Sequence, residues 1–394
     1  MQFEFHTVPR IVFGRGSFAR AGELAGGFGR RALVIASASA SRVGLTDRLV
    51  EMLAEAGVAG VVVEQVGEPQ VGDVDAAVAV ADRERCTIAV GLGGGSAIDA
   101  AKAVAGLIAN GGRASDYMEV IGLGKKITAP AAPWIAIPTT AGTGAEVTRN
   151  AVIGWKEKGF KASIRSEHLL ACIAIVDPEL GVGVRPEVTA RCGMDALCQL
   201  IESYTSTGAN PMTDGLALQG LALAGPALRR AYSRPDDLDA REAMALAALL
   251  SGITLTNAGL GAVHGLAAPL GAKLPVPHGT VCAALLGPVI RANLAELRKR
   301  GASSAAKQFL ARYATIGRTL TGRADLDESS AGDAAADFCD SLARDLHIPR
   351  LGEFGLDEAT ADEIAHLAQK SSSMKYNPVP PSAATLKEVL LKAM

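Results

Sequence analysis

The sequence predicts a two-domain protein, with an α/β domain over residues 1–182 and an all-α domain over residues 183–394. Two observations lead to this prediction. In the first part, short apolar runs alternate with helical stretches, which is typical of a parallel sheet with helices on both faces. From residue 183 onward, Ala/Leu-rich helical stretches dominate and strand signals are few.

Each element can be assigned from its residue pattern. Five apolar runs are expected to contain strands: 31–37, 60–66, 87–96, 133–140 and 171–180. Three stretches with helical spacing are expected between them: 46–58, 68–86 and 97–110. The second domain is expected to contain helices at 186–206, 213–233, 239–259, 304–320 and 359–371. The polar segment 320–337 is expected to be a surface connection between helices.

Composition limits the classes of function. The 394 residues carry 39 basic and 41 acidic side chains, a net charge of −2 and only 4% aromatic residues, so we expect no nucleic-acid partner. No uninterrupted apolar run approaches the ~20 residues of a membrane span, and MQFEFHTVPR lacks the basic start and apolar run of a signal peptide. The six cysteines form no Cys-x-x-Cys pair, which predicts reduced thiols in a cytoplasmic protein without membrane association.

A glycine-rich loop is the first candidate ligand site. In VGLGGGSAIDAAKA, Gly93, Gly94 and Gly95 follow a predicted strand and precede a predicted helix. Glycines let the backbone approach a phosphate, and the helix N-terminus offers unpaired N–H groups. Ser96 is placed to cap the helix and to donate to a phosphate. The match to G-x-G-x-x-G is incomplete and a tight strand–helix turn is the alternative, but three consecutive glycines favour nucleotide binding.

A second small polar loop follows the next predicted strand. The stretch IPTTAGTGAEVTRNAVI contains Thr139, Thr140 and Thr143 among glycines. Ligands of open α/β sheets bind at the carboxyl ends of parallel strands, where this loop is expected. The alternative is a solvated Ser/Thr loop, but beside the glycine loop the pattern favours a ligand cleft.

Asp195 and Gln199 are four residues apart in GMDALCQLIESYTS, a stretch with helical spacing. Both side chains therefore fall on one face of the predicted helix. The pair has three interpretations: a metal site with one weak ligand, a site that never held metal, or ordinary helix surface.

Two of the six histidines lie 14 residues apart, on either side of a Pro/Gly-rich turn. His264 and His278 can therefore face one point. With one carboxylate from elsewhere they would form the three-ligand arrangement of catalytic zinc, and imidazole also suits iron. The alternative is a pair of buried, hydrogen-bonded histidines. The other four have no partner at such spacing: His6, His168, His347 and His366.

Four stretches taken together resemble the iron-containing (group III) alcohol dehydrogenases: GGGSAIDAAK, IPTTAGTGAEVT, GMDALCQLIE and AVHGLAAPLGAKLPVPHG. VDPEL and SMKYNPVPPSAATLKEVL also fit, so the resemblance covers essentially the whole chain. It implies a dehydroquinate-synthase-like architecture, with an N-terminal dinucleotide-binding domain and a C-terminal helical domain. It further implies hydride transfer between a small alcohol or aldehyde and a nicotinamide cofactor, with a divalent metal acting on the substrate oxygen. Homodimers are common in this family.

The resemblance implies two sets of site residues. The set that would bind the dinucleotide is Gly94, Gly95, Ser96, Asp99, Lys102, Thr139, Thr140, Thr143 and Lys161. The glycines and Ser96 would hold the pyrophosphate, the threonines would line the cofactor, and Lys161 would contact its ribose or nicotinamide end. The set that would bind the metal and carry out catalysis is Asp195, His264 and His278, three of the family's four ligands.

The chain departs from the family pattern at two positions. Gln199 stands where the family has the fourth ligand, a histidine, and Ala268 stands where it usually has a second histidine that could relay a proton. A Gln carbonyl is a weaker ligand than imidazole, so Fe(II) affinity should fall. We expect a retained Fe(II) or Zn(II), with Gln199 either a distant fourth ligand or a hydrogen-bonding partner of bound water or substrate. Water, the cofactor ribose or Thr143 would carry the proton.

The cofactor and the reaction each leave an alternative. The early strand ends in RALVIASASASR, which places Ser37 and Arg42 where an acidic residue would repel a 2′-phosphate, so we expect NADP slightly ahead of NAD. The runner-up function is a metal-independent reduction of an oxo-acid or enone, like that of maleylacetate reductases. A dehydroquinate-synthase-like lyase and a non-catalytic cofactor-binding protein are weaker alternatives.

Overall fold

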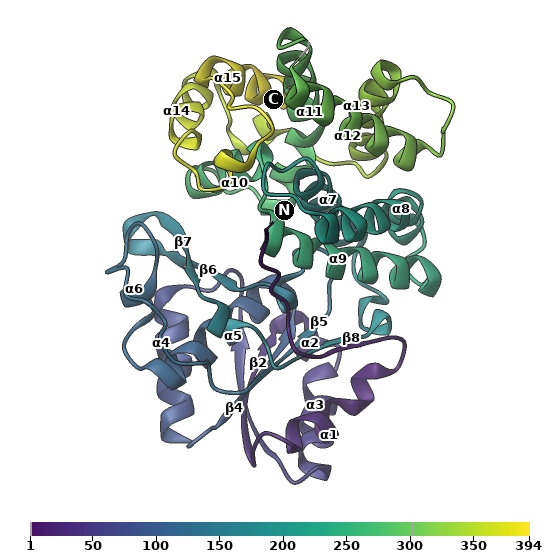
Figure 1. Ribbon diagram of the computed structural model, residues 1–394. Helices are drawn as coiled ribbons and strands as arrows, with labels where there is room; N and C mark the ends of the chain where they lie inside the picture. The colour runs from purple at the N-terminus through teal and green to yellow at the C-terminus, as the bar shows by residue number, and fades with distance from the viewer. Residues whose placement is uncertain (1, 302) are drawn as a thin grey trace. The chain divides into compact units, whose positions relative to one another are not determined.

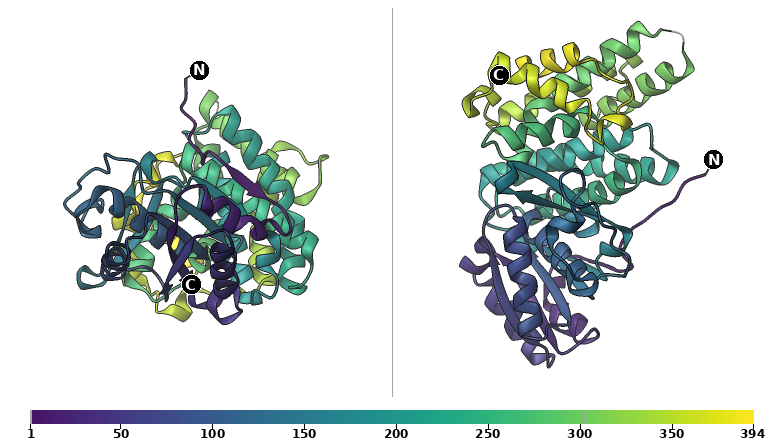
Figure 2. Two further views of the ribbon diagram at one scale, coloured as in Figure 1. Left: turned by 90° about the horizontal axis from the view of Figure 1, so that it is seen from below. Right: turned by 90° about the vertical axis from the view of Figure 1, so that its left-hand side faces the viewer.

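The computed structural model describes residues 2–301 and 303–394 of the chain (Figure 1). The described residues divide into two compact units. The first, here called the α/β unit, comprises His6–Thr140 and Gly144–Val182. The second, here called the helical unit, comprises Gly183–Met394 together with Ala141–Thr143 and residues 2–5. Figure 2 shows the parallel strands in one unit and the helices of the other from two further directions.

A parallel sheet forms the centre of the α/β unit, as the sequence predicted. Among the described residues it contains six strands in the order β1-β8-β5-β4-β2-β3, and every neighbouring pair is parallel. The strands are β1 (Ile11–Phe13), β2 (Arg31–Ser37), β3 (Ala59–Gln65), β4 (Ile88–Gly93), β5 (Trp134–Pro138) and β8 (Ile173–Val176). The sequence did not predict β1, because three residues are too short to show an alternating pattern.

Helices cover both faces of this sheet (Figure 1). They are α1 (Ala21–Gly26), α2 (Ala38–Arg42), α3 (Leu45–Glu55), α4 (Val71–Arg83), α5 (Gly95–Asn110) and α6 (Ala114–Tyr117). Val34 of β2 packs in one core cluster with Leu49 and Leu53 of α3. Its neighbours Leu33 and Ile35 are also buried but point to the opposite face, because side chains alternate along a strand.

Two further strands form an antiparallel hairpin that the sequence did not predict. They are β6 (Asn150–Trp155) and β7 (Phe160–Arg165), paired so that Gly154 lies opposite Lys161. The hairpin is attached to α5, because the N–H of Val152 donates to Asp99 Oδ2 at 3.0 Å. Its charged and exposed residues resembled loop, so the sequence pattern did not separate it from the preceding threonine loop.

The helical unit is built from long helices, as the sequence predicted. They are α7 (Pro186–Tyr204), α8 (Pro211–Ser233), α9 (Leu238–Ala258), α10 (Ala262–Lys273), α11 (His278–Lys299), α12 (Ser304–Thr321), α13 (Glu328–Asp345), α14 (Glu358–Ala368) and α15 (Ala383–Lys392). The core runs through α7, where Met194, Leu197 and Leu200 are fully buried. Because α7 is central, its polar residues Asp195, Gln199 and Glu202 are also buried inside the unit.

The expected surface connection over 320–337 is wrong for most of its length. Only residues 322–327 connect the helices, since α12 continues to Thr321 and α13 begins at Glu328. Asp327 caps α13 by accepting from the N–H of Ser330 at 3.0 Å. The buried face of this part of α13 consists of small residues such as Ala331 and Ala335, and its exposed face is polar. That combination has the composition of a loop but the spacing of a helix.

One helix among the described residues, His278–Lys299, has the length and hydropathy of a membrane span, and 67% of its apolar window is buried inside the protein. The bent pair α9 and α10 meets the same criterion only if the two are counted together, across a 99° bend. Burial of this kind is typical of the core helix of a globular unit, and α11 indeed contributes Val281, Leu285 and Leu286 to the core of the helical unit.

Candidate metal and cofactor sites

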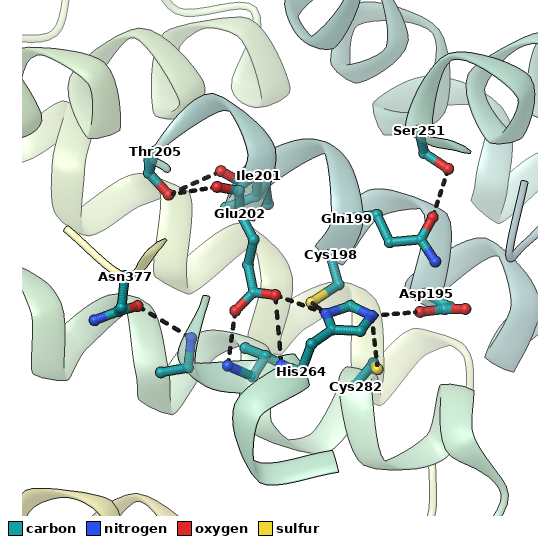
Figure 3. Close-up of polar contacts among 12 residues, drawn as sticks. Asp195, Cys198, Gln199, Ile201, Glu202, Thr205, Ser251, His264, Cys282 and Asn377 are labelled. Atoms are coloured by element: carbon teal, nitrogen blue, oxygen red, sulfur yellow. Dashed lines mark hydrogen bonds and ion pairs between the residues drawn. The ribbon is translucent and has the colours of Figure 1, made fainter. Parts of the chain in front are cut away.

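Three helices of the helical unit bring a cluster of polar side chains together (Figure 3). Asp195 lies on α7, His264 is the third residue of α10, and His278 is the first residue of α11. Pro277 is extended and ends the turn before α11. Gly279 permits the close packing that follows, because a Cβ atom there would collide with the backbone oxygen of Arg191 on α7.

Asp195 and the two histidines converge on one point. Asp195 Oδ1 lies 3.2 Å from His264 Nε2 and 3.6 Å from His278 Nε2. The two imidazole centroids are 5.3 Å apart. Asp195 is 2% exposed and His264 9%, whereas 45% of the His278 side chain is exposed. The cluster is therefore buried on the α7 side and accessible to solvent at His278.

Glu202 fixes the orientation of His264. Its Oε2 lies 2.6 Å from His264 Nδ1, and its Oε1 accepts from the N–H of Val263 at 2.7 Å. With the proton on Nδ1, the lone pair of Nε2 faces Asp195, which is the arrangement of a metal-binding histidine supported by a carboxylate. The sequence analysis missed Glu202. Its spacing was the available signal, since Glu202 is seven residues after Asp195 and therefore on the same face of α7.

Two cysteines complete the cluster, and the sequence analysis had treated both as ordinary core thiols. Cys282 Sγ lies 3.7 Å from His264 Nε2 and 3.6 Å from His278 Nε2. Cys198 Sγ lies 3.9 Å from Nδ1 of His264. Helical spacing was again the available signal, because Cys282 follows His278 by one turn of α11 and Cys198 follows Asp195 by three residues of α7.

The titratable side chains of the cluster shift one another's pKa values. Burial alone would raise the pKa of Cys282, but a hydrogen bond from Cys198 and the facing His278 and His264 lower it well below its usual value. Cys282 in turn raises the pKa of His278 to about 9, against the effect of burial. Burial raises the pKa of Asp195, although both histidines oppose the rise. A metal ion bound here would have to displace the protons that the histidines hold.

Gln199 lies beside this cluster, and its carbonyl oxygen is already engaged. Its Oε1 accepts from Ser251 Oγ at 2.7 Å, on the side away from His264 (Figure 3). The residue is buried at 3% exposure. Ala268 lies further along α10, one turn after His264, and supplies no polar group.

Several of the predicted cofactor residues lie at the carboxyl ends of three adjacent strands of the parallel sheet, β2, β4 and β5. Gly93 ends β4 opposite Pro138 of β5, and its oxygen accepts from the N–H of Thr139 at 2.9 Å. Gly93 has a φ of +150°, and a Cβ atom there would contact Ser37 at the end of β2 at 2.7 Å. Thr140 lies against Gly94, with Oγ1 3.2 Å from the position of a Cβ atom.

Ser96 does not cap α5, contrary to the expectation. Gly94 is the N-cap in an extended conformation, and Gly95 and Ser96 are the first two residues of the helix. The helix begins earlier than its apolar pattern suggested, because glycine can make the transition directly from the strand. Gly94 itself provides no side-chain capping hydrogen bond for α5. An anion is the ligand that such a 16-residue helix favours at this end.

Asp99 and Lys102 hold the hairpin to α5. Lys102 Nζ is fully buried and donates to Ala145 O, Thr148 Oγ1 and Asn150 O at 2.7–2.8 Å. It also lies 3.3 Å from Asp99 Oδ1. Both carboxylate oxygens of Asp99 are thus occupied, one by Lys102 and the other by Val152.

Two further predicted cofactor residues, Lys161 and Thr143, lie outside the glycine loop. Lys161 on β7 forms an ion pair with Glu68. Thr143 belongs to the short segment Ala141–Thr143 that clusters with the helical unit.

A parallel-sheet unit with a glycine-capped helix, and a helical unit with a carboxylate–histidine cluster, are the features expected of a nicotinamide-dependent oxidoreductase whose helical domain could hold a metal. Comparison with known proteins identifies the family. The family model "Iron-containing alcohol dehydrogenase" matches residues 9–178, and the model of the C-terminal part of the same family matches residues 189–394. The chain belongs to the iron-containing alcohol dehydrogenase family, and the family predicted from the motifs is confirmed.

Individual relatives are similar over nearly their whole length. Alcohol dehydrogenase 4 of Schizosaccharomyces pombe is 34% identical over 99% of this chain and 89% of its own length. The 1,3-propanediol dehydrogenase of Klebsiella pneumoniae is 35% identical over 95% of this chain and 94% of its own. A crystal structure of 1,3-propanediol oxidoreductase superposes with a TM-score of 0.91 at 32% identity and covers 100% of both chains. The chain is an oxidoreductase of the alcohol dehydrogenase type, and these relatives do not favour the maleylacetate-reductase-like alternative.

Proposed function

We propose that this chain interconverts small alcohols and aldehydes with NAD(P), and that Asp195, His264 and His278 hold the divalent metal that binds the substrate oxygen. The observation that supports this most is the convergence of three donor atoms from three helices, at 3.2 and 3.6 Å from Asp195 Oδ1. In a tetrahedral site with metal–ligand bonds of about 2.0 Å, neighbouring N and O donors lie about 3.3 Å apart. The donor set thus fits Zn(II) or Fe(II) in both chemistry and spacing.

The chain's own residues prepare this site for substrate. Glu202 holds His264 with its Nε2 toward Asp195, so little reorganisation is needed on binding. The exposed side of His278 leaves access for a small molecule. When bound, the metal supplies a Lewis acid for the substrate oxygen. Because Ala268 cannot carry a proton, we propose water, the cofactor ribose or Thr143 for that role.

For the cofactor, we propose that Gly94, Gly95 and Ser96 hold the pyrophosphate at the N-terminus of α5. The same strand ends carry Ser37, Thr139 and Thr140. Asp99 contributes indirectly, because it attaches the hairpin of β6 and β7 to α5. When bound, the nicotinamide supplies the hydride donor or acceptor. Thr143 and Lys161 are proposed to contact it as the family resemblance implies, with Lys161 exchanging its contact to Glu68 for the cofactor.

The choice between the two dinucleotides is proposed to lean slightly toward NADP. β2 ends in Ser37, and no carboxylate follows it up to the exposed Arg42 at the end of α2. A 2′-phosphate would therefore meet no repulsion there and could pair with Arg42. A relative from Bacillus methanolicus, 32% identical, is named an NAD-dependent methanol dehydrogenase. Both cofactors must therefore be measured.

We also propose that the two predicted domains, 1–182 and 183–394, correspond to the two units and that the enzyme works as a cytoplasmic homodimer. The start of the helical unit at Gly183 supports the boundary. The dimer rests on the family resemblance, and the cytoplasmic location rests on the free cysteines among the described residues.

Steady-state kinetics test the proposed function directly. Primary alcohols and diols with NAD or NADP should be turned over, a chelator should abolish the rate, and Zn(II) or Fe(II) should restore it. His264→Ala and His278→Ala should each nearly abolish kcat. Unchanged rates after complete chelation would contradict the metal role and direct the search to oxo-acids and enones.

A further inference from the structure

The cluster of Asp195, His264 and His278 contains one further donor atom, the sulfur of Cys282, which is not among the family's four ligands. Cys282 is four residues after His278, so one turn of α11 places both side chains on the same face. Its Sγ is 3.6 Å from His278 Nε2 and 3.7 Å from His264 Nε2. The donor atoms of these three residues and of Asp195 all lie within 4.8 Å of one another.

The two sulfur–nitrogen separations are close to those of a tetrahedral site. With metal–sulfur bonds of about 2.3 Å and metal–nitrogen bonds of about 2.0 Å, a thiolate and an imidazole on one tetrahedral ion lie about 3.5 Å apart. Both sulfur–nitrogen distances of Cys282 agree with that value. An apolar environment would suit a thiol that only fills space, but Cys282 is fully buried and faces two imidazoles and a carboxylate.

Gln199 leaves a place for such a ligand. It stands where the family has a ligating histidine, and its carbonyl oxygen accepts from Ser251 instead. Cys282 comes from a different helix, α11 rather than α7, and it is buried, as Gln199 is. Relative to the family pattern, α7 lacks the ligating histidine at position 199, and α11 offers the sulfur of Cys282.

We propose that Cys282 is the fourth protein ligand of the metal, and that its sulfur makes the site prefer Zn(II) to Fe(II). The inference rests on the proposed metal site of Asp195, His264 and His278. On binding, the protons that the histidines hold are released to solvent and the Cys282 thiolate forms the metal–sulfur bond, with no change of oxidation state. A thiolate is a softer ligand than the imidazole that the family uses, and soft ligands favour Zn(II) over Fe(II).

Cobalt substitution tests the inference without relying on activity. Metal-free protein loaded with one equivalent of Co(II) should develop the intense near-ultraviolet charge-transfer band of a cobalt–thiolate bond. Cys282→Ser should abolish this band and lower Zn(II) affinity by more than about 100-fold, since even the loss of a supporting residue costs 10–100-fold. X-ray absorption of the Zn(II) protein should show one sulfur neighbour at about 2.3 Å.

Two control variants separate Cys282 from the other thiols. Cys198→Ala removes the neighbouring sulfur next to His264 Nδ1, and Cys339→Ala removes a buried thiol of α13 outside the cluster. Both should keep the band. A band that survives in Cys282→Ser but disappears in Cys198→Ala would overturn the assignment.

The unmodified protein keeps the test decisive even if Cys282→Ser does not fold. Co(II) bound stoichiometrically without a charge-transfer band would overturn the role of Cys282 and leave the three-ligand site standing. A protein that binds no Co(II) at all would contradict both this inference and the proposed function.

Discussion

Glu202 Oε2 and His264 Nδ1 are 2.6 Å apart, and this contact sets the direction in which His264 presents its other nitrogen. Both residues are at least nine-tenths buried. A buried carboxylate at this position raises the basicity of the imidazole and holds its ring in place. The orientation of His264 therefore depends on Glu202, a residue that contacts neither the expected metal nor the substrate.

Glu202→Gln should therefore weaken metal binding about 10- to 100-fold. Glutamine can keep the acceptor for the N–H of Val263 but not the charged contact with Nδ1. Zn(II) affinity measured by competition with a chelating dye checks this, and excess Zn(II) should restore much of kcat. Glu187→Gln, an exposed substitution in the first turn of the same helix, should leave affinity unchanged. Equal affinities in the two variants would contradict the positioning role.

Gln199→His should raise Fe(II) affinity at least about 10-fold, because it adds an imidazole beside Asp195. The same change removes the side-chain acceptor of Ser251, whose hydroxyl can still donate to Ala248 O at 2.8 Å, so the free energy of unfolding should fall by no more than about 1 kcal/mol. Parallel Fe(II) and Zn(II) titrations measure the first effect and urea unfolding measures the second. Ser251→Ala isolates the stability term. An unchanged Fe(II) affinity would mean that position 199 cannot reach the metal.

Glu146 predicts a pH dependence of stability in the α/β unit. It is buried in the 3-10 helix Ala145–Val147, and burial raises its pKa from 4.5 to about 7. Between these values the folded state holds a proton that the unfolded state has lost, so the free energy of unfolding falls as pH rises. This contribution should lower the free energy of unfolding by about 2 kcal/mol between pH 5.5 and pH 8.

Glu146→Gln should remove this loss. Its free energy of unfolding relative to the unmodified protein should increase by about 2 kcal/mol from pH 5.5 to pH 8. Urea unfolding at the two pH values measures the difference. Glu157→Gln, an exposed change in the neighbouring hairpin, serves as the control. A difference that does not depend on pH would show that Glu146 is ionised in the folded state throughout.

Lys102→Met should destabilise the protein by about 3–5 kcal/mol even without cofactor, because it removes a fully buried cation and leaves the partly buried Asp99 without its partner. The three oxygens that Lys102 Nζ contacts would also lose a donor. Thermal unfolding with and without NADP separates this structural role from cofactor binding. A loss that appears only when NADP is present would contradict it.

The sequence predicted the features that depend on local spacing. Alternation of strand and helix patterns was enough for the parallel sheet, and the motif spacing was enough for the family. The spacing also suggested that His264 and His278 face one point, and their rings are 5.3 Å apart.

Features that depend on packing between distant segments could not be read from the sequence. Helical spacing places Glu202 on the face of Asp195 and Cys282 on the face of His278, but both become neighbours of His264 only because α7, α10 and α11 pack together. Asp99 was assigned to the cofactor from the motif, whereas its contacts to Val152 and Lys102 arise from an unpredicted hairpin. Ser96 was misplaced as a cap because Gly94 starts the helix earlier.

Metal content is the most direct test of the central claim that Asp195, His264 and His278 hold a catalytic metal. Protein purified without a His-tag should be analysed for metals before and after anaerobic loading with Fe(II) or Zn(II), alongside Asp195→Ala. The account predicts close to one ion per chain, lost in the variant while its fold is retained. A protein that stays metal-free under every loading condition yet still oxidises alcohols would contradict it.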